Sequence, residues 1–266
     1  MRRIARTLIV PLAAATASCG VLDSMERELV FRPVVENWAG YSPEILREEE
    51  VWIPVGSDGE RLHAWWLAAP GAVHTLLYFH GARVNLSGSA YRLRAFRNGG
   101  FNVLAIDYRG FGKSSPALPS EQSVYEDGEA AWRWLEARVP DPRRRILYGH
   151  SLGAAVAAEV ALRGGNAAAL VLESSFTSIA ELAAPGLPIT QRLDVLEKLG
   201  RLELPVLIVH GAQDEVVPPE MARRLYEAAR GPKRLLLVQG AGHRWVAMHA
   251  GKTLYSALEE IAAAER

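Results

Sequence analysis

The chain has 266 residues, of which 49% are hydrophobic and 23% are charged, a balance typical of one globular α/β domain with a sizeable core. Its 30 basic and 30 acidic side chains give a formal net charge of zero, so the composition favours neither nucleic-acid binding nor long-range steering of a charged substrate. The single cysteine excludes an internal disulfide and any metal site built on a cysteine cluster.

Residues 1–19 are typical of a bacterial secretory signal. Three arginines precede Thr7, residues 7–12 form an apolar stretch, and residues 13–19 are mostly small. The apolar stretch is too short to span a membrane. The end of the segment, Thr16-Ala17-Ser18-Cys19, resembles a bacterial lipobox, which implies that Cys19 is lipidated and becomes the mature N-terminus.

Two other interpretations of this segment stay open. Ordinary cleavage after Ala17 would leave Cys19 as a free thiol, and an uncleaved N-terminal anchor would make the cysteine incidental. Lipidation would hold the protein on the periplasmic side of a membrane in the bacterial envelope, whereas ordinary cleavage would release it as a soluble periplasmic or secreted protein. We expect residues 20–48 to form an N-terminal extension that begins with a short amphipathic helix at residues 21–31, ended by Arg32-Pro33.

Residues 49–266 are predicted to form one α/β domain. The segments 51–55 and 62–67 flank Gly56-Ser57-Asp58-Gly59, which predicts an antiparallel hairpin. From residue 75 onward, apolar strand patterns alternate with helical patterns, which indicates a mostly parallel central sheet with helices on both faces. The predicted strands after the hairpin are 75–79, 102–106, 145–148, 168–173, 206–209 and 234–238. The predicted helices are 88–97, 120–138, 152–162, 219–229 and 245–264.

A G-x-S-x-G sequence stands between a predicted strand and a predicted helix, at Gly149-His150-Ser151-Leu152-Gly153. A turn this tight strains the backbone at the serine and packs the strand against the helix, so Gly149 and Gly153 must lack side chains. The N-terminus of the following helix favours negative charge beside the Ser151 hydroxyl. Ser151 is therefore the predicted nucleophile.

Two titratable residues follow later strands. Asp214 comes after the strand at 206–209, and His243 comes after the strand at 234–238. The carboxyl ends of strands in an open α/β sheet are where the chemistry is placed. We therefore expect His243 to act as the general base for Ser151, with Asp214 orienting and stabilising the imidazole ring.

These motifs resemble those of the α/β-hydrolase superfamily across nearly all of the chain after its first few dozen residues. More narrowly, the sequence is similar to a membrane-associated branch that includes animal depalmitoylating thioesterases and bacterial lipoprotein hydrolases. The segments that carry the resemblance are LLYFHG at 76–81, NVLAIDYRGFGKS at 102–114, PSE at 119–121 and ESSFTS at 173–178. Ala82 stands directly after His-Gly, where this branch usually has Asn.

The resemblance implies an α/β-hydrolase fold and roles for further residues. The backbone N–H groups of Ala82 and Leu152 would form the oxyanion hole. Asp107, a competitor of Asp214 for the acid of the triad, would belong to a structural turn. Residues 175–204 would form a short cap over a fairly open pocket, and no cofactor or metal is required.

A serine nucleophile with an oxyanion hole indicates hydrolysis of esters, thioesters or, less often, amides through an acyl-enzyme. Together with the expected anchor, this favours small-molecule acyl esters or thioesters at a membrane. A serine aminopeptidase-like peptidase and a non-catalytic envelope binding protein on the same fold are the alternatives. The short cap argues against the first, and the complete Ser151, Asp214 and His243 set argues against the second. The sequence does not determine the oligomeric state.

Overall fold

The apolar runs of the sequence form one sheet in the part of the chain that this computed structural model describes, which is residues 9–42, 46, 48–183, 187 and 189–264. The described residues contain eight strands in the order β1-β2-β4-β3-β5-β6-β7-β8. The strands are β1 (Glu49–Pro54), β2 (Arg61–Leu67), β3 (Thr75–Phe79), β4 (Asn102–Ile106), β5 (Arg145–His150), β6 (Ala169–Glu173), β7 (Val206–Gly211) and β8 (Lys233–Val238).

The pairing of the strands confirms the predicted hairpin and the mostly parallel sheet. Strand β1 pairs with β2 and β2 pairs with β4 in antiparallel fashion, and the other neighbours are parallel. Thr75 lies opposite both Asn102 and Arg145, so β3, β4 and β5 begin at one level. Their carboxyl ends therefore meet at one edge of the sheet, and the loops that follow them are brought together there.

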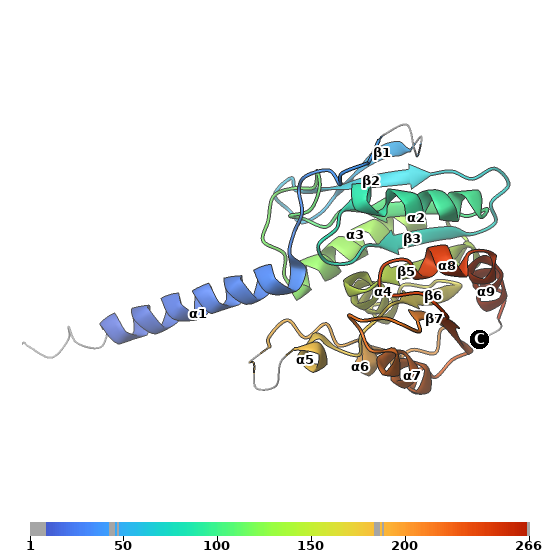
Figure 1. Cartoon of the computed structure of the whole chain (residues 1–266). Coiled ribbons are helices and arrows are strands. Elements are labelled where there is room, and N and C mark those ends of the chain that lie inside the picture. Colours follow the sequence, from blue (N-terminus) through green and yellow to red (C-terminus); the bar gives the residue numbers. More distant parts are fainter. Residues whose placement is uncertain (1–8, 43–45, 47, 184–186, 188, 265–266) are drawn as a thin grey trace, which may run out of the picture.

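Helices cover both faces of the sheet (Figure 1). Side chains of one strand alternate between the faces, so Leu77 belongs to one apolar core and Tyr78 to the other. Helices α3, α4, α6 and α7 pack on the first core, and α2, α8 and α9 pack on the second. The helices after α1 are α2 (Leu86–Asn98), α3 (Glu121–Arg138), α4 (Leu152–Leu162), α5 (Ile179–Leu182), α6 (Val195–Leu199), α7 (Pro219–Ala228), α8 (Val246–Ala250) and α9 (Lys252–Ala262).

Two helices differ from the sequence-based expectation. The single helix expected at 245–264 was wrong, because Gly251 has φ 49° and ψ −125° and separates α8 from α9. The N-terminal helix α1 (Ile9–Phe31) starts well before residue 21. Pro11 lies in its first turn, where a missing N–H breaks no helical hydrogen bond, and the residues that follow are rich in Leu and Ala.

The predicted boundary at residue 19 falls inside α1 and stays a prediction. Residues 1–8 and the side chain of Cys19 lie outside the described part of the chain. None of the described helices is both long and apolar enough to cross a lipid bilayer.

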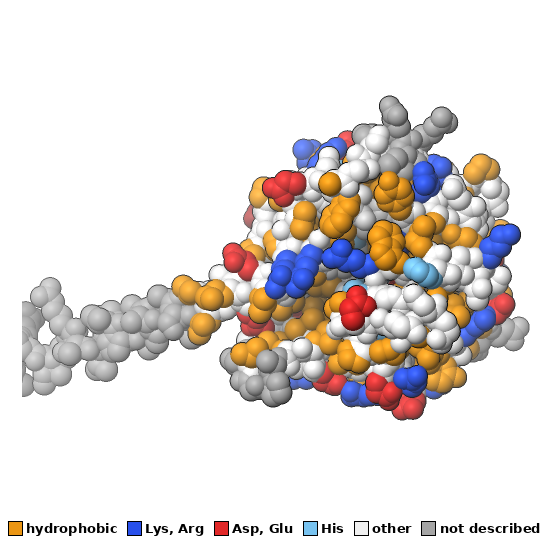
Figure 2. All heavy atoms as spheres, in the orientation of Figure 1, with side chains coloured by type: hydrophobic (Ala, Val, Ile, Leu, Met, Phe, Trp, Pro, Cys, Tyr) orange, Lys and Arg blue, Asp and Glu red, His pale blue; other side chains and the backbone are white. Residues whose placement is uncertain are grey.

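The C-terminal half of α1 is attached to the body of the protein, and its N-terminal half stands away from it (Figure 1). Phe31 is fully buried, Arg27 Nε donates to Pro119 O over 2.9 Å, and Glu26 accepts from the N–H of Thr190 over 2.7 Å. These partners lie in the loop after β4 and in the predicted cap, so the C-terminal end of α1 lies at the edge where the parallel strands end. Figure 2 shows apolar side chains on the described part of α1 and along the hollowed surface next to it. Four of those on α1 are more than half exposed, namely Val21, Leu22, Met25 and Leu29.

The segment between β6 and β7 contains the predicted cap. Its described part holds only the short helices α5 and α6, with residues 184–186 and 188 outside the description. Ser178 begins α5 by accepting from the N–H of Glu181, and Asp194 begins α6 by accepting from the N–H of Glu197. Little regular structure therefore covers the sheet edge on this side.

Candidate active site

Ser151 lies at the sharp turn between β5 and α4. Its φ of 54° and ψ of −117° place it in a region that residues with side chains rarely adopt. Packing on both sides enforces this geometry, because a Cβ added to Gly149 would lie 2.2 Å from Gly153 O and one added to Gly153 would lie 2.1 Å from Phe79 O. The Ser151 N–H donates to Glu173 O over 2.8 Å, which fixes the turn to β6.

The backbone N–H groups of Leu152, directly after Ser151, and of Ala82, in the loop after β3, have no acceptor among the described residues. Leu152 is the first residue of α4, where helical geometry leaves N–H groups free. Ala82 follows Gly81 in the loop after β3, and a Cβ on Gly81 would lie 3.3 Å from the Cβ of Ser151. Free donors so placed are suited to bind an oxygen that gains negative charge during a reaction at Ser151.

His243 joins Ser151 to Asp214 by two hydrogen bonds. Its Nδ1 lies 2.8 Å from Asp214 Oδ2, and its Nε2 lies 3.1 Å from Ser151 Oγ. An ionised carboxylate only accepts, so the proton of the neutral ring belongs on Nδ1, and Nε2 is left to accept from the serine hydroxyl. The three residues that the sequence predicted as a triad are thus brought together, from the ends of β5, β7 and β8.

Asp214 is held as a carboxylate by several donors. Its Oδ1 accepts from the N–H groups of Val216 and Val217 over 2.9 and 2.8 Å, and its Oδ2 lies 3.2 Å from His210 Nε2. Burial alone would raise the pKa of Asp214, but the hydrogen bonds from His210, His243 and Val217 override it and hold that pKa far below its usual range. His210 was not predicted from the sequence as a partner of Asp214. Its position four residues before Asp214, at the end of the same strand, was the available signal.

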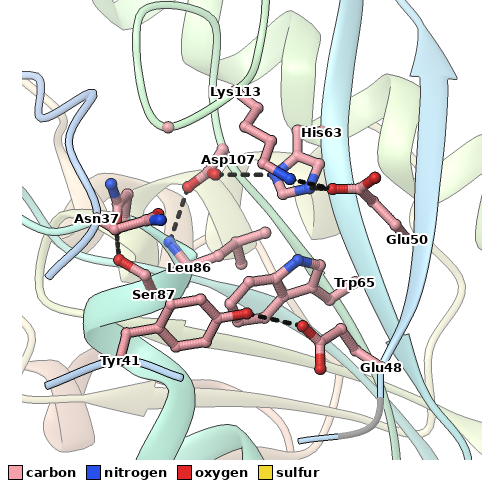
Figure 3. A pocket seen from close by; sticks show the side chains of 12 residues that line it. Asn37, Tyr41, Glu48, Glu50, His63, Trp65, Leu86, Ser87, Asp107 and Lys113 are labelled. Carbon is pink, nitrogen blue, oxygen red and sulfur yellow. Dashed lines mark hydrogen bonds and ion pairs between the residues drawn. The ribbon is translucent and has the colours of Figure 1, made fainter. Parts of the chain in front are cut away.

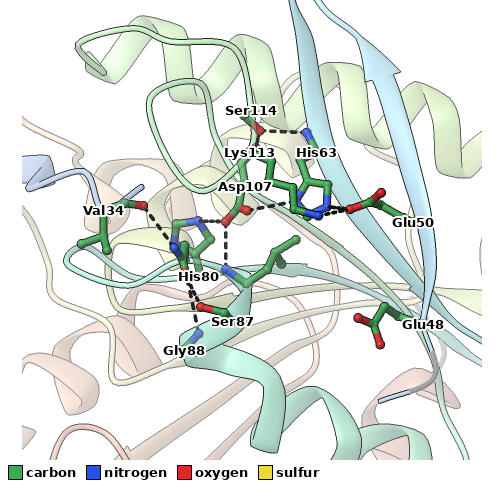
Figure 4. A network of polar contacts seen from close by, with 12 residues as sticks. Val34, Glu48, Glu50, His63, His80, Ser87, Gly88, Asp107, Lys113 and Ser114 are labelled. Atoms are coloured by element: carbon green, nitrogen blue, oxygen red, sulfur yellow. Dashed lines mark hydrogen bonds and ion pairs between the residues drawn. The ribbon is translucent and has the colours of Figure 1, made fainter. Parts of the chain in front are cut away.

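Asp107 is bound elsewhere, by residues of β2 and α2 (Figure 4). Its Oδ1 accepts from the N–H of Leu86, at the start of α2, over 2.8 Å, and its Oδ2 lies 3.2 Å from His63 Nδ1. His80 Nε2 lies 3.5 Å from Asp107 Oδ1, while His80 Nδ1 donates to Gly81 O over 2.7 Å. Asp107 therefore connects β2, α2 and the loop that carries Ala82.

A separate cavity of about 230 Å³ opens beside this network (Figure 3). Tyr41 and Trp65 stack at 5.3 Å on one side, and Tyr41 donates to Glu48 over 2.7 Å. None of the residues that line it belongs to the group formed by Ser151, Asp214 and His243. The candidate chemistry therefore lies outside this cavity.

Comparison with known proteins identifies the family. The family model described as serine aminopeptidase, S33, matches residues 71–194 and 190–247, which are more than half of the chain. The human alpha/beta hydrolase domain-containing protein 17B is 34% identical over 199 residues, which are 73% of this chain and 68% of that protein. The chain belongs to the α/β-hydrolase superfamily. An uncharacterised protein of Mycobacterium tuberculosis is also 34% identical, over 96% of this chain and 95% of its own length.

Solved structures of α/β hydrolases share the fold. An esterase of Pyrococcus furiosus superposes with a TM-score of 0.69 at 23% identity, covering 86% of this chain and 96% of its own. The esterase domain of a Rhodothermus marinus protein has a TM-score of 0.62 at 25% identity, covering 80% of this chain and 98% of its own. These similarities confirm the fold that the sequence predicted.

The contact at Gly153 generates a prediction on stability. Gly153→Ala should lower the free energy of unfolding by about 1–3 kcal/mol, because its Cβ would meet the backbone of Phe79. Gly200→Ala is the control, since Gly200 has φ −62° and its added Cβ would meet no atom closer than 3.5 Å. Urea unfolding followed by circular dichroism measures both, and equal stability of the two variants would contradict the packing described for the turn.

The surroundings of Asp214 predict a pH dependence of stability. The pKa of this carboxyl is lowered in the folded state, so the unfolded chain takes up the proton first as the pH falls. The stabilising contribution is thus complete above about pH 4, the ordinary pKa of an aspartate, and is lost at lower pH. Asp214→Asn should be less stable than wild type at pH 7, with the difference shrinking below pH 4. Asp58→Asn, in the exposed turn between β1 and β2, is the control, and a gap that stays constant with pH would refute the prediction.

Proposed function

We propose that this α/β hydrolase cleaves carboxylic esters or thioesters through an acyl-enzyme on Ser151. The observation that carries the proposal is the chain of hydrogen bonds from Asp214 through His243 to Ser151, beside two unpaired N–H donors. The similarity to the Rhodothermus marinus esterase domain supports the same reaction class. A second line of support is the strained conformation of Ser151, which is the geometry of a nucleophile elbow.

The reaction follows from the positions of the atoms. Ser151 Oγ forms a bond to the substrate carbonyl carbon while its proton moves to His243 Nε2. The carbonyl oxygen becomes an oxyanion that accepts from the N–H groups of Ala82 and Leu152, and the Asp214 carboxylate stabilises the imidazolium. His243 then gives the proton to the leaving oxygen or sulfur as that bond breaks. Water repeats the two steps on the acyl-enzyme and releases the carboxylic acid.

The proposed substrates are small molecules with an apolar acyl group. Three large apolar side chains on the loops after β6, β7 and β8 are more than half exposed, namely Leu187, Val216 and Trp245. Val216 and Trp245 each stand two residues from a member of the proposed triad, so they border its surface. Exposed apolar side chains such as Val216 and Trp245 next to a reactive group favour binding of an acyl chain over a sugar or a peptide backbone.

We also propose that a lipid on Cys19 anchors the protein to a membrane of the bacterial envelope, on its periplasmic side. The lipobox-like sequence supports this localisation, and so do the four exposed apolar side chains of α1 that follow Cys19. An apolar helix stripe next to an acyl anchor supplies the second membrane attachment that one chain alone lacks. The substrates would then be acyl esters or thioesters at that membrane.

A second candidate function is aminopeptidase-like hydrolysis. The name of the matching family model favours it, and so does Glu215, an exposed carboxylate whose Oε2 would lie 2.7 Å from a Cβ on Gly242. A carboxylate beside His243 is suited to hold the free amine of a peptide. The small cap weighs against this candidate.

The test of the proposed function is hydrolysis of p-nitrophenyl esters from acetate to palmitate by the full chain in detergent. Wild type should turn over the esters, and Ser151→Ala should lower kcat by about 10⁴–10⁶-fold because the nucleophile is lost. Asp214→Asn should lower it by about 10⁴-fold through the wrong tautomer of His243. Palmitoyl thioesters and aminoacyl p-nitroanilides, assayed in parallel, separate the two candidate functions.

If wild type and Ser151→Ala are equally silent on every substrate, and a fluorophosphonate probe does not label Ser151, hydrolysis is refuted. A non-catalytic binding protein on this fold would then be the better explanation.

The anchor proposal is tested with Cys19→Ser in a bacterial host. The wild-type protein should incorporate a labelled fatty acid and sediment with membranes, whereas the variant should do neither or sediment far less, because the acyl group supplies most of the attachment. Ser18→Ala, which leaves the cysteine in place, is the control. Sedimentation that is unchanged in Cys19→Ser, without incorporated lipid, would favour an uncleaved anchor.

A further inference from the structure

A buried ion pair lies next to the turn that carries His243. Glu173, the last residue of β6, is fully buried, and Arg92 of α2 has a side chain that is 11% exposed. Arg92 Nη2 lies 3.1 Å from Glu173 Oε1. Burial by itself would lower the pKa of Arg92, but the Glu173 carboxylate together with Tyr78 and Tyr148 outweighs burial and raises that pKa, so the guanidinium stays charged.

The pair binds the backbone on the C-terminal side of His243. Arg92 Nη2 donates to Arg244 O over 2.6 Å, and Glu173 Oε1 accepts from the N–H of Ala247 over 3.2 Å. One of these contacts is at the residue directly after His243, and the other is at the start of α8. The path of the chain out of His243 is thus fixed by charged side chains from α2 and β6.

The carbonyl group of His243 itself is held as well. Ser174 Oγ donates to it over 3.1 Å, and His150 Nε2 lies 3.3 Å from it. A carbonyl oxygen only accepts, so His150 carries its proton on Nε2. Burial, reinforced by the positive charge of Arg92, lowers the pKa of His150 far below its usual range, which keeps the ring neutral and this donor in place.

Arg92 and Glu173 are also hydrogen-bonded to tyrosines of β5 and β3, the strands that precede Ser151 and the loop of Ala82. Tyr148 of β5 donates its hydroxyl to Glu173 Oε2 over 2.8 Å, and Arg92 Nη1 donates to the hydroxyl of Tyr78 of β3 over 3.2 Å. Strand β5 runs into Ser151, and β3 runs into the loop of Ala82. The network therefore connects the backbone of His243 to the two strands that position the nucleophile and one oxyanion donor.

The contribution of such a pair lies in geometry more than in stability. Removing two charges from water costs free energy that their attraction barely offsets, and Arg92 Nε finds no acceptor among the described residues. In contrast, the 3.1 Å contact between His243 Nε2 and Ser151 Oγ is sensitive to small shifts of the turn. A displacement of about 1 Å in a catalytic group lowers rates by about 10²-fold.

We propose that Arg92 and Glu173 are positioning residues that set the place of His243 relative to Ser151. The inference rests on the proposed function, because the consequence of the geometry is a rate of proton transfer. Neither residue touches the reacting atoms, and each acts through the backbone of residues 244–247.

The test replaces both members at once, as Arg92→Met with Glu173→Gln, since loss of one partner alone leaves a buried uncompensated charge. We expect kcat for p-nitrophenyl butyrate to fall about 10–100-fold with KM within about twofold of wild type. The matched control is Lys198→Met with Glu159→Gln. That pair is also buried, at 3.2 Å, and joins α6 to α4 on the opposite face of the sheet. The kcat of this control variant should stay within twofold of wild type even if its stability falls as much as that of the Arg92/Glu173 variant.

Ser174→Ala is the second variant, because it removes a donor to the His243 carbonyl without touching a charge. It should lower kcat several-fold with little change in KM or in unfolding temperature. A readout independent of turnover is the low-field proton resonance of the His243 Nδ1–H···Asp214 hydrogen bond. This resonance should be sharp in wild type and in the control, and displaced or exchange-broadened in the Arg92/Glu173 variant.

The outcomes separate the two proposals. Wild-type turnover that Ser151→Ala abolishes upholds the function, and an Arg92/Glu173 variant that folds and keeps wild-type kcat then overturns the positioning role. An equal loss of kcat in the Lys198/Glu159 control overturns it too, as would an unchanged low-field resonance. If the paired variant does not fold, Ser174→Ala decides by the same criteria. If wild type is inactive on all substrates, the proposed function fails, and the resonance alone decides whether the network sets the His243 ring.

Discussion

The approach of α4 to the end of β3 is the constraint on which the rest of the site depends. Because Gly153 has no side chain, the first turn of α4 can approach the Phe79 carbonyl closely. Because Gly149 has none, the end of β5 can approach the backbone of Gly153 in the same way. With both ends so close, the residue between them has no relaxed backbone conformation available, and Ser151 takes a positive φ. The buried alanine-rich surface of α4 holds that strain in place, because the helix is packed between the sheet and α3.

The other residues of the candidate site come from loops at the same edge of the parallel sheet. Strands that begin in register end in register, so loops that are distant in the chain bring His243 and Asp214 to the same edge as Ser151. Further residues fix each of these side chains in place. Asp214 accepts from two valine N–H groups and lies next to His210, and the pair Arg92 and Glu173 binds the backbone that follows His243. Asp107 supports a different part of the edge, through Leu86 and His63.

Much of this was predictable from the sequence, because the determining patterns are local. Strand positions follow from runs of apolar residues, and the turn at Ser151 follows from two glycines at fixed spacing. The break at Gly251 was not predictable from the helical spacing of apolar residues, because the apolar pattern of α9 continues that of α8. Only the conformation of one glycine separates the two helices. The roles of His210, Arg92 and Glu173 depend on contacts between distant elements, such as the contact between Arg92 and Glu173, which are 81 positions apart in the sequence. A single polar residue in an apolar run carries no signal of its partner.

The reach of α1 has a consequence for how substrate is found. The first described hydrogen bond from α1 to the body is at Glu26, so residues 20–25 would place about 9 Å of helix between the proposed lipid on Cys19 and the body. This length of helix is well under the roughly 30 Å thickness of a bilayer core, so the site would stay within a thin layer at the membrane surface. If enzyme and substrate were both confined to that layer as proposed, diffusion in three dimensions would be replaced by a search in two, with an effective concentration far above the bulk value. The length of one helix would then set which esters the hydrolase encounters, before any pocket selects among them.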